Sequence, residues 1–234
     1  MIRKFYDYLK LYGLGTLIFF IYGELRMLKR GLLQKSFSQN EEDILIDNLL
    51  GNKKSGFYVD VGAYNPTRLS NTKRFYLRGW TGINIEPDPH KIKRFYRSRP
   101  RDINLNLGVA NKTGKLTYFK FEPETLSTFS KSTAKNYEKQ RFKLVDTSKI
   151  KVLKLADILE SYSKDKDIDF VSIDVEGCDY EVLKSNSWNK FKPQLICVEA
   201  DEEAEKAIQK FLSKVGYEKV CRNHNNLIFL LKGK

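Results

Sequence analysis

Short apolar runs alternate with charged, amphipathic stretches from about residue 36 onward, and this alternation most restricts the fold. The apolar runs are too short for buried helices and are bounded by turn residues, so they predict buried strands. We expect strands at 57–61, 82–86, 103–110, 116–121, 169–175, 195–200, 217–222 and 227–231. Strands that alternate with helices form a mostly parallel sheet with helices on both faces. The sequence therefore predicts an α/β fold.

Helical spacing of apolar residues predicts helices between several of these strands. We expect them at 41–50, 69–78, 89–97, 180–185 and 203–215. Residues 122–150 are polar and rich in Ser, Thr and Lys, and we expect them to be irregular. The last two strands are separated by Asn223-His224-Asn225-Asn226, which is typical of a hairpin turn. This hairpin would place one antiparallel strand at or near an edge of the sheet.

Residues 1–35 differ in composition from the rest of the chain, which we expect to form one domain over 36–234. Leu11 to Gly23 is a run of thirteen residues without a charge, with bases on both sides. A membrane-spanning helix needs about 20 apolar residues, so the run is too short to cross a bilayer. It also lacks the small-residue cleavage site of a signal peptide. We expect an apolar, basic helix that lies in a membrane interface or docks on protein, and the sequence leaves both open.

The chain is basic, with a formal net charge of +13. Such an excess favours an anionic partner, which could be a phosphate-bearing substrate, a membrane surface or a nucleic acid. The three cysteines form no CxxC pair. Their odd number and spacing argue against a disulfide framework and a zinc site, and favour a reducing compartment. We therefore expect a cytoplasmic protein, with residues 1–35 available for peripheral contact at the inner face of the membrane.

The turn after the first predicted strand carries a glycine at position 62. Ligands of parallel α/β sheets bind at the carboxyl ends of the strands, and glycine lets a ligand approach the backbone closely. The three-glycine dinucleotide fingerprint is absent, which argues against NAD and FAD. Glu86 ends the second predicted strand, 24 residues after Gly62. A carboxylate there can accept hydrogen bonds from both ribose hydroxyls. One glycine turn and this acid suit a nucleoside with a small zwitterionic tail, such as S-adenosylmethionine.

Five segments follow one another in the order FSQNEED at 37–43, YVDVGA at 58–63, LSNT at 69–72, GWTGINIEP at 79–87 and IDVEG at 173–177. In sequence and spacing they resemble the FkbM family of S-adenosylmethionine-dependent methyltransferases, from about residue 37 to residue 200. The resemblance implies a class I methyltransferase fold, which is Rossmann-like and has seven strands, the last antiparallel. It also implies O-methylation, commonly of sugars or natural products. Residues 1–35 lie outside the resemblance, and residues 120–151 match it poorly.

By the same topology, three acids meet where two neighbouring strands end: Asp174, Glu176 and Glu199. Methyl transfer from a sulfonium requires the enzyme to position the acceptor oxygen and to remove its proton. We expect Asp174 to be the general base or the anchor of the acceptor hydroxyl, with Glu176 and Glu199 shaping its surroundings. In the alternatives, the three acids hold Mg²⁺, Asp174 only caps the following helix, or Glu199 pairs with a core Lys or Arg.

The cofactor site is expected to draw on the matching motifs and on the end of the third strand. The candidates are Gln39, Asp60, Gly62, Ala63, Asn71, Glu86, Pro87, Asn106 and Gly108. Asn106 and Gly108 stand where class I methyltransferases line the adenine pocket. Gln39 either closes over the cofactor or belongs to a capped helix on the rim, and Asn71 has the same cap alternative. No His or Cys grouping predicts a resident zinc ion.

These features favour an S-adenosylmethionine-dependent O-methyltransferase that acts on a sugar hydroxyl in a glycan, glycolipid or nucleotide-sugar precursor. One alternative is an RNA methyltransferase that uses the basic stretch 91–101 against phosphates. Phe95 and Tyr96 interleave with those bases at helical spacing, which favours a helix packed on the core over a nucleic-acid surface. The other alternative is a non-catalytic relic of the fold that binds the cofactor without turnover.

Overall fold

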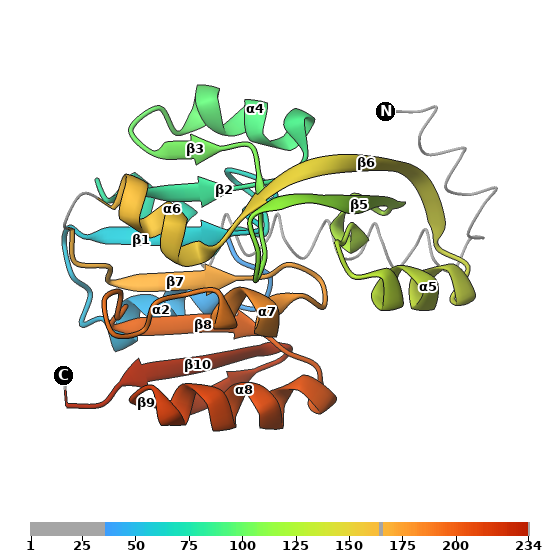
Figure 1. The fold of residues 1–234 in the computed structure, drawn as a ribbon. Coiled ribbons are helices and arrows are strands. Elements are labelled where there is room, and N and C mark those ends of the chain that lie inside the picture. The colour runs from blue at the N-terminus through green and yellow to red at the C-terminus, as the bar shows by residue number, and fades with distance from the viewer. Residues whose placement is uncertain (1–35, 164–165, 234) are drawn as a thin grey trace.

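The structure is a computed structural model that describes residues 36–163 and 166–233. Its main sheet has seven strands in the order β3-β2-β1-β7-β8-β10-β9 (Figure 1). Their bounds are β1 Phe57–Val61, β2 Thr81–Ile85, β3 Ile103–Leu105, β7 Phe170–Ile173, β8 Leu195–Glu199, β9 Tyr217–Asn223 and β10 Asn226–Leu231. Only β10 runs against its neighbours, next to the edge strand β9. This order, with one reversed strand, is the predicted class I methyltransferase fold.

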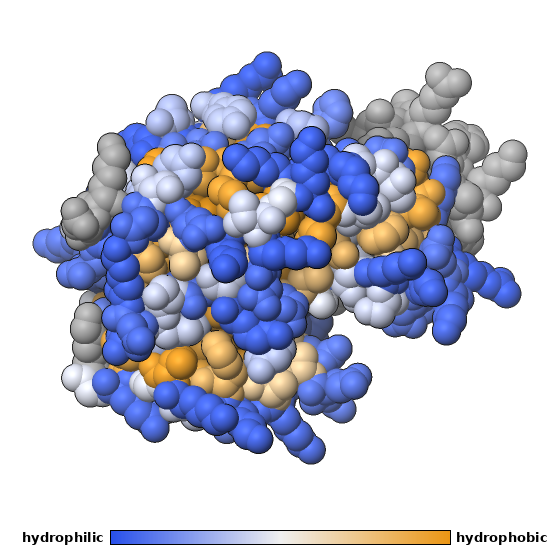
Figure 2. Space-filling view, in the orientation of Figure 1, coloured by the Kyte–Doolittle hydropathy of each residue, from blue (hydrophilic) through white to orange (hydrophobic). Residues whose placement is uncertain are grey.

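Helices cover both faces of this sheet. Every residue of β1 is buried, and alternate side chains of a strand point to opposite faces. Val59 packs in the core beneath α6 (Leu155–Tyr162), α7 (Asp179–Lys184) and α8 (Glu202–Lys214). Tyr58 packs on the other face with α2 (Glu42–Leu49) and α3 (Lys73–Leu77). Figure 1 shows α6 and α7 in front of the sheet and α2 behind it. Hydrophilic residues dominate the face seen in Figure 2, and hydrophobic residues show only in patches between them.

The chain also forms a second sheet, which the sequence did not predict. Its strands are β4 Gly108–Val109, β5 Gly114–Glu122 and β6 Lys143–Leu153, in the order β4-β6-β5. The short helix η2 (Glu124–Leu126) and α5 (Lys131–Lys139) lie between β5 and β6. We call residues 106–154 the insert. In Figure 1 the insert reaches past the carboxyl ends of β1, β2 and β7, with α5 beyond them.

Two predictions about this region are wrong. The single strand expected at 103–110 splits, because the Asn106 side chain donates to the Glu86 and Pro87 carbonyls and the chain leaves the main sheet there. Residues 122–150 are not irregular, because they contain α5 and most of the eleven-residue strand β6. The sequence does not reveal β6, because only one of its eleven residues is buried and polar residues interrupt its apolar ones. Helix α6 was also not predicted.

The helix expected at 69–78 begins only at Lys73. Leu69 has a left-handed backbone, with φ of 52°. The hydroxyls of Ser70 and Thr72 accept hydrogen bonds from Arg99, so this segment is held as a loop.

The helix expected within residues 1–35 lies outside the described residues. Among the residues that the structure describes, no helix combines the length and apolar character needed to cross a bilayer.

Candidate active site

The turn after β1 brings three strand ends together. Gly62 and Ala63 both donate backbone hydrogen bonds to the Ile85 carbonyl at the end of β2. Gly62 has φ of +81°, and a Cβ placed on it would lie 1.8 Å from the Asp174 carbonyl oxygen, just beyond β7. Only glycine fits this position, because both its backbone angle and the close approach exclude a side chain. The turn is therefore pressed against the segment that carries the predicted base.

Glu86 lies where β2 ends and is 3% exposed. Its Oε2 accepts from the Tyr64 amide at 3.0 Å and its Oε1 from the Asp88 amide at 2.8 Å. Burial raises the pKa of Glu86, while Lys91 opposes that rise. The two amides fix the carboxylate, and each oxygen keeps a lone pair for another donor. The two hydroxyls of a ribose could donate hydrogen bonds to these remaining lone pairs.

Asp60 and Asn71 tie the following loop to the sheet. Asp60 is buried and accepts from the Thr72 hydroxyl at 2.6 Å. Asn71 donates to the Ser172 hydroxyl of β7 at 3.0 Å. Arg99, which is fully buried, donates to Thr72 and to the Pro66 carbonyl. These contacts hold the loop in place on the side of the sheet, and no local sequence pattern marks Arg99.

The three predicted acids come together at the carboxyl edge. Oxygens of Asp174, Glu176 and Glu199 all lie within 4.8 Å of one another. Neighbouring strands bring them there, because Ile173 of β7 pairs with Val198 of β8. We call these three residues the acidic cluster.

Like charges and surrounding protein atoms raise the proton affinity of this cluster. Asp174 is open to solvent, yet the protein packed around it and the adjacent Glu199 raise its pKa well above the usual range. Burial and Asp174 raise the pKa of Glu176 to about 7. Burial, Glu176 and Asp179 raise the pKa of Glu199 to about 8. Glu176 and Glu199 therefore have pKa values in the range that suits a general base near neutral pH.

Two purely structural roles predicted for these acids, a helix cap for Asp174 and an ion pair for Glu199, are wrong. Asp174 does not cap α7, because the N-cap residue is Cys178 and no side chain makes a cap hydrogen bond there. Asp179 accepts from the amides of Val175 at 3.0 Å and Gly177 at 3.1 Å, just before the helix. No Lys or Arg among the described residues lies within 4.0 Å of the Glu199 carboxylate as an ion-pair partner. The base and the Mg²⁺ alternatives both stay predictions.

The opening motif lies at the rim of the site. Asn40 accepts from the Asn223 side chain at 2.8 Å, and Glu42 accepts from Asn226 at 3.2 Å. Asn226 pairs with Glu199, so this motif borders the acidic cluster. Gln39 is exposed there, which is compatible with either role predicted for it.

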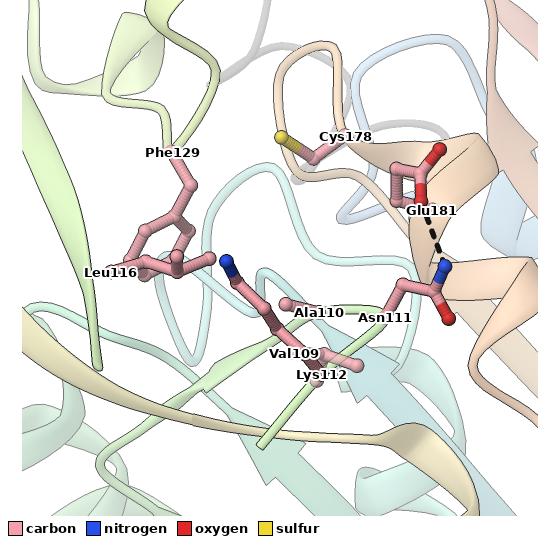
Figure 3. A pocket seen from close by; sticks show the side chains of 8 residues that line it. All are labelled: Val109, Ala110, Asn111, Lys112, Leu116, Phe129, Cys178 and Glu181. Atoms are coloured by element: carbon pink, nitrogen blue, oxygen red, sulfur yellow. Dashed lines mark hydrogen bonds between the residues drawn. The ribbon is translucent and has the colours of Figure 1, made fainter. Parts of the chain in front are cut away.

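A pocket of about 380 Å³ opens between the insert and α7 (Figure 3). It is lined by Val109, Ala110, Asn111, Lys112, Leu116, Phe129, Cys178 and Glu181. Its walls are mainly apolar, and the Lys112 ammonium points between them. Burial raises the pKa of the Cys178 thiol to about 11, so the thiol stays neutral. Gly108 has no room for a side chain, because its Cβ would lie 2.5 Å from the Phe129 ring.

The sequence from 60 to 219 matches the family described as "Methyltransferase FkbM domain". The chain belongs to the FkbM methyltransferase family. The matched family is one of methyltransferases, in agreement with the activity that the sequence predicts. No curated protein matches its sequence significantly.

Solved structures resemble this FkbM methyltransferase only distantly. The METTL16 methyltransferase domain has a TM-score of 0.47 and 13% identity over 82% of this chain, which spans 66%, just under two thirds, of that one. The precorrin-6y C5,15-methyltransferase of Geobacter metallireducens has a TM-score of 0.39 and 13% identity, over 82% of this chain and 86% of that one.

Proposed function

We propose that the chain is an O-methyltransferase acting on a sugar hydroxyl in a glycan, glycolipid or nucleotide-sugar precursor. The observation that carries this proposal is the acidic cluster pressed against the Gly62 turn. A sugar hydroxyl is a poor nucleophile near neutral pH and needs a base to take its proton. Glu176 and Glu199, with pKa values of about 7 and about 8, titrate in that range.

The described residues fit S-adenosylmethionine, which supplies an electrophilic methyl group when bound. Glu86 would accept from the ribose hydroxyls, since both its oxygens are fixed and each has a free lone pair. Gly62 leaves the backbone open to close approach. The apolar pocket beside Ala110 and Phe129 would take the adenine. Asn106 and Gly108 support it indirectly, through the Glu86 carbonyl and the Phe129 ring.

In this proposal Asp174 accepts the proton of the acceptor hydroxyl at a carboxylate oxygen. Its proton affinity is raised by Glu199 and by the packed protein around it, which suits it to that step. Glu176 and Glu199 lie beside it, and a positive centre bound there would favour the ionised forms of all three acids. Together the acids favour a ligand with a positive centre in this position.

The acceptor class, the cytoplasmic location and the membrane contact of residues 1–35 belong to the same proposal. The basic net charge of +13 supports an anionic partner, such as a nucleotide-linked sugar or lipid headgroups. We do not favour RNA as that partner, because Phe95 of the basic α4 (Pro89–Ser98) is fully buried in the core.

The first test is calorimetric titration of the full chain with S-adenosylmethionine and its demethylated product. We expect micromolar binding that is lost in Glu86→Ala. The labelled cofactor is then incubated with nucleotide sugars and with lipid-linked glycans, using wild type and Asp174→Asn. Label in a sugar fraction with wild type alone supports the proposal. Transfer at the wild-type rate by Asp174→Asn would overturn the base assignment, and failure to bind cofactor would overturn the whole proposal.

A further inference from the structure

The insert contacts the loop around Glu176 at three points. The Thr128 hydroxyl donates to the Glu176 carbonyl at 2.7 Å. The Tyr137 hydroxyl, from α5, donates to Glu176 Oε2 at 2.6 Å. Gly177 lies so close to Thr133 that a Cβ on it would be 2.5 Å from the Thr133 hydroxyl. The insert is therefore built into the candidate active site.

The backbone and the carboxylate of Glu176 are both in unfavourable positions that contacts with the insert can stabilise. Its φ of 55° places it in the left-handed region, which costs a residue with a side chain about 1–2 kcal/mol. Conformations of this kind persist where the surroundings hold them. Its carboxylate also lies beside two further acids, Asp174 and Glu199, whose ionised forms would repel it. Without a donor it would be free to turn away from them.

Tyr137 is well placed to be that donor. Its ring packs edge-on against Phe121 and Phe142, with centroid distances of 5.6 and 6.0 Å. These contacts restrict the ring and aim the hydroxyl at Glu176. Burial and the hydrogen bond to Glu176 raise the pKa of Tyr137 far above its ordinary value, so the phenol keeps its proton.

We propose that Tyr137 is a positioning residue, whose hydroxyl holds the Glu176 carboxylate within the acidic cluster, facing the positive sulfonium of the cofactor. This inference rests on the proposed function, because it takes the acidic cluster to face the transferred methyl group. It assigns the insert a role in the chemistry, through a residue outside the motifs that mark the family.

The test needs no acceptor. S-adenosylmethionine carries a sulfonium charge that its demethylated product lacks, so the ratio of their dissociation constants reports the negative charge near that centre. Calorimetry measures this ratio for wild type, Tyr137→Phe, Glu176→Gln and the double variant. Tyr217→Phe is the matched control, because Tyr217 is buried and its hydroxyl donates to the Pro193 carbonyl at 2.7 Å, away from the cluster.

We expect wild type to prefer the charged cofactor, and Tyr137→Phe to reduce that preference about threefold to tenfold. Glu176→Gln should reduce it as well, and the double variant should lose no more than Glu176→Gln alone. Tyr217→Phe should keep the wild-type preference while losing comparable thermal stability.

A preference that survives Tyr137→Phe, or losses that add in the double variant, would overturn this inference and leave the proposed function standing. Equal affinity of the wild type for both ligands would also overturn it. A wild type that binds neither ligand would overturn the proposed function itself, and this inference with it.

Discussion

Gly62 and Asp174 meet at the carboxyl edge of the sheet so closely that a Cβ on Gly62 would lie 1.8 Å from the Asp174 carbonyl oxygen. The contact joins the turn proposed to bind the cofactor to the segment that carries the proposed base. Neither can move without displacing the other. In the proposed function, this backbone contact would fix the distance between the methyl donor and the base.

Gly62→Ala should destabilise the protein and abolish cofactor binding. The added methyl meets backbone in a position that already requires a left-handed conformation. Gly51→Ala is the control, because Gly51 has φ of +66° with nothing within 4 Å of its added Cβ. The control should cost about 1 kcal/mol of unfolding free energy. Gly62→Ala should cost about 1–3 kcal/mol more, as overpacking does. Urea unfolding and calorimetry measure both effects, and equal losses would contradict the close contact.

Glu86→Gln should weaken S-adenosylmethionine binding about tenfold to a hundredfold, the usual range for losing a hydrogen bond to a charged group. The amide also turns one acceptor into a donor, which the amides of Tyr64 and Asp88 cannot satisfy. Glu218→Gln changes an exposed carboxylate on β9 and should bind normally. Calorimetric titration measures the affinity of both variants for S-adenosylmethionine. Equal affinities would contradict a role for Glu86 in cofactor binding.

The sequence was sufficient to predict the core of the fold. The strands β1, β2, β7 and β8 are short and largely apolar, because both faces of a parallel sheet are buried. The topology then places the ends of β7 and β8 side by side, which is why Asp174 and Glu199 could be expected to meet. Gly62 predicted the turn after β1, because few other residues fit a tight turn with a positive φ.

The insert and its contacts could not be predicted in this way. β6 has only one buried residue, Val152, so its pattern resembles a solvated loop. Tyr137 and Arg99 act through tertiary hydrogen bonds across 39 and 33 positions of the chain, to Glu176 and to Pro66. No local periodicity encodes such pairs, because their partners are chosen by the assembled fold.

The stability of the protein should fall as pH rises from about 4.5 to about 8. Glu176, Glu199 and Asp179 have folded pKa values of about 7, 8 and 8, above their ordinary 4.5, 4.5 and 3.8. In this window the folded chain binds more protons than the unfolded chain, so the free energy of unfolding decreases with pH. Urea unfolding in the presence of EDTA at about pH 5.5 and about pH 8.5, which bracket these folded pKa values, measures the difference.

Glu199→Gln should flatten this pH dependence, because it removes one group and relieves its neighbours. Glu138→Gln, on an exposed position of α5, should leave it unchanged. A stability that rises over this range in wild type would show that the acidic cluster is ionised without cost, and would contradict the raised pKa values.

Arg99 should be the most stabilising charged residue behind the site. It is fully buried and donates to the hydroxyls of Ser70 and Thr72 and to the Pro66 carbonyl. Its positive charge also opposes the raised pKa of the buried Asp60. Arg99→Met leaves these acceptors unpaired, and we expect a loss of about 3–5 kcal/mol in unfolding free energy.

Arg99→Lys should rescue little of that loss, because a single ammonium cannot reproduce the fork that reaches all three acceptors. Arg97→Met, two residues earlier and exposed on α4, should change stability by no more than about 0.5 kcal/mol. Since Arg99 holds the loop between Gly62 and α3, its variants should also bind S-adenosylmethionine more weakly than their remaining stability explains. Calorimetry below the unfolding temperature tests this, and full affinity in a folded Arg99→Lys protein would show that the loop keeps its shape without the guanidinium.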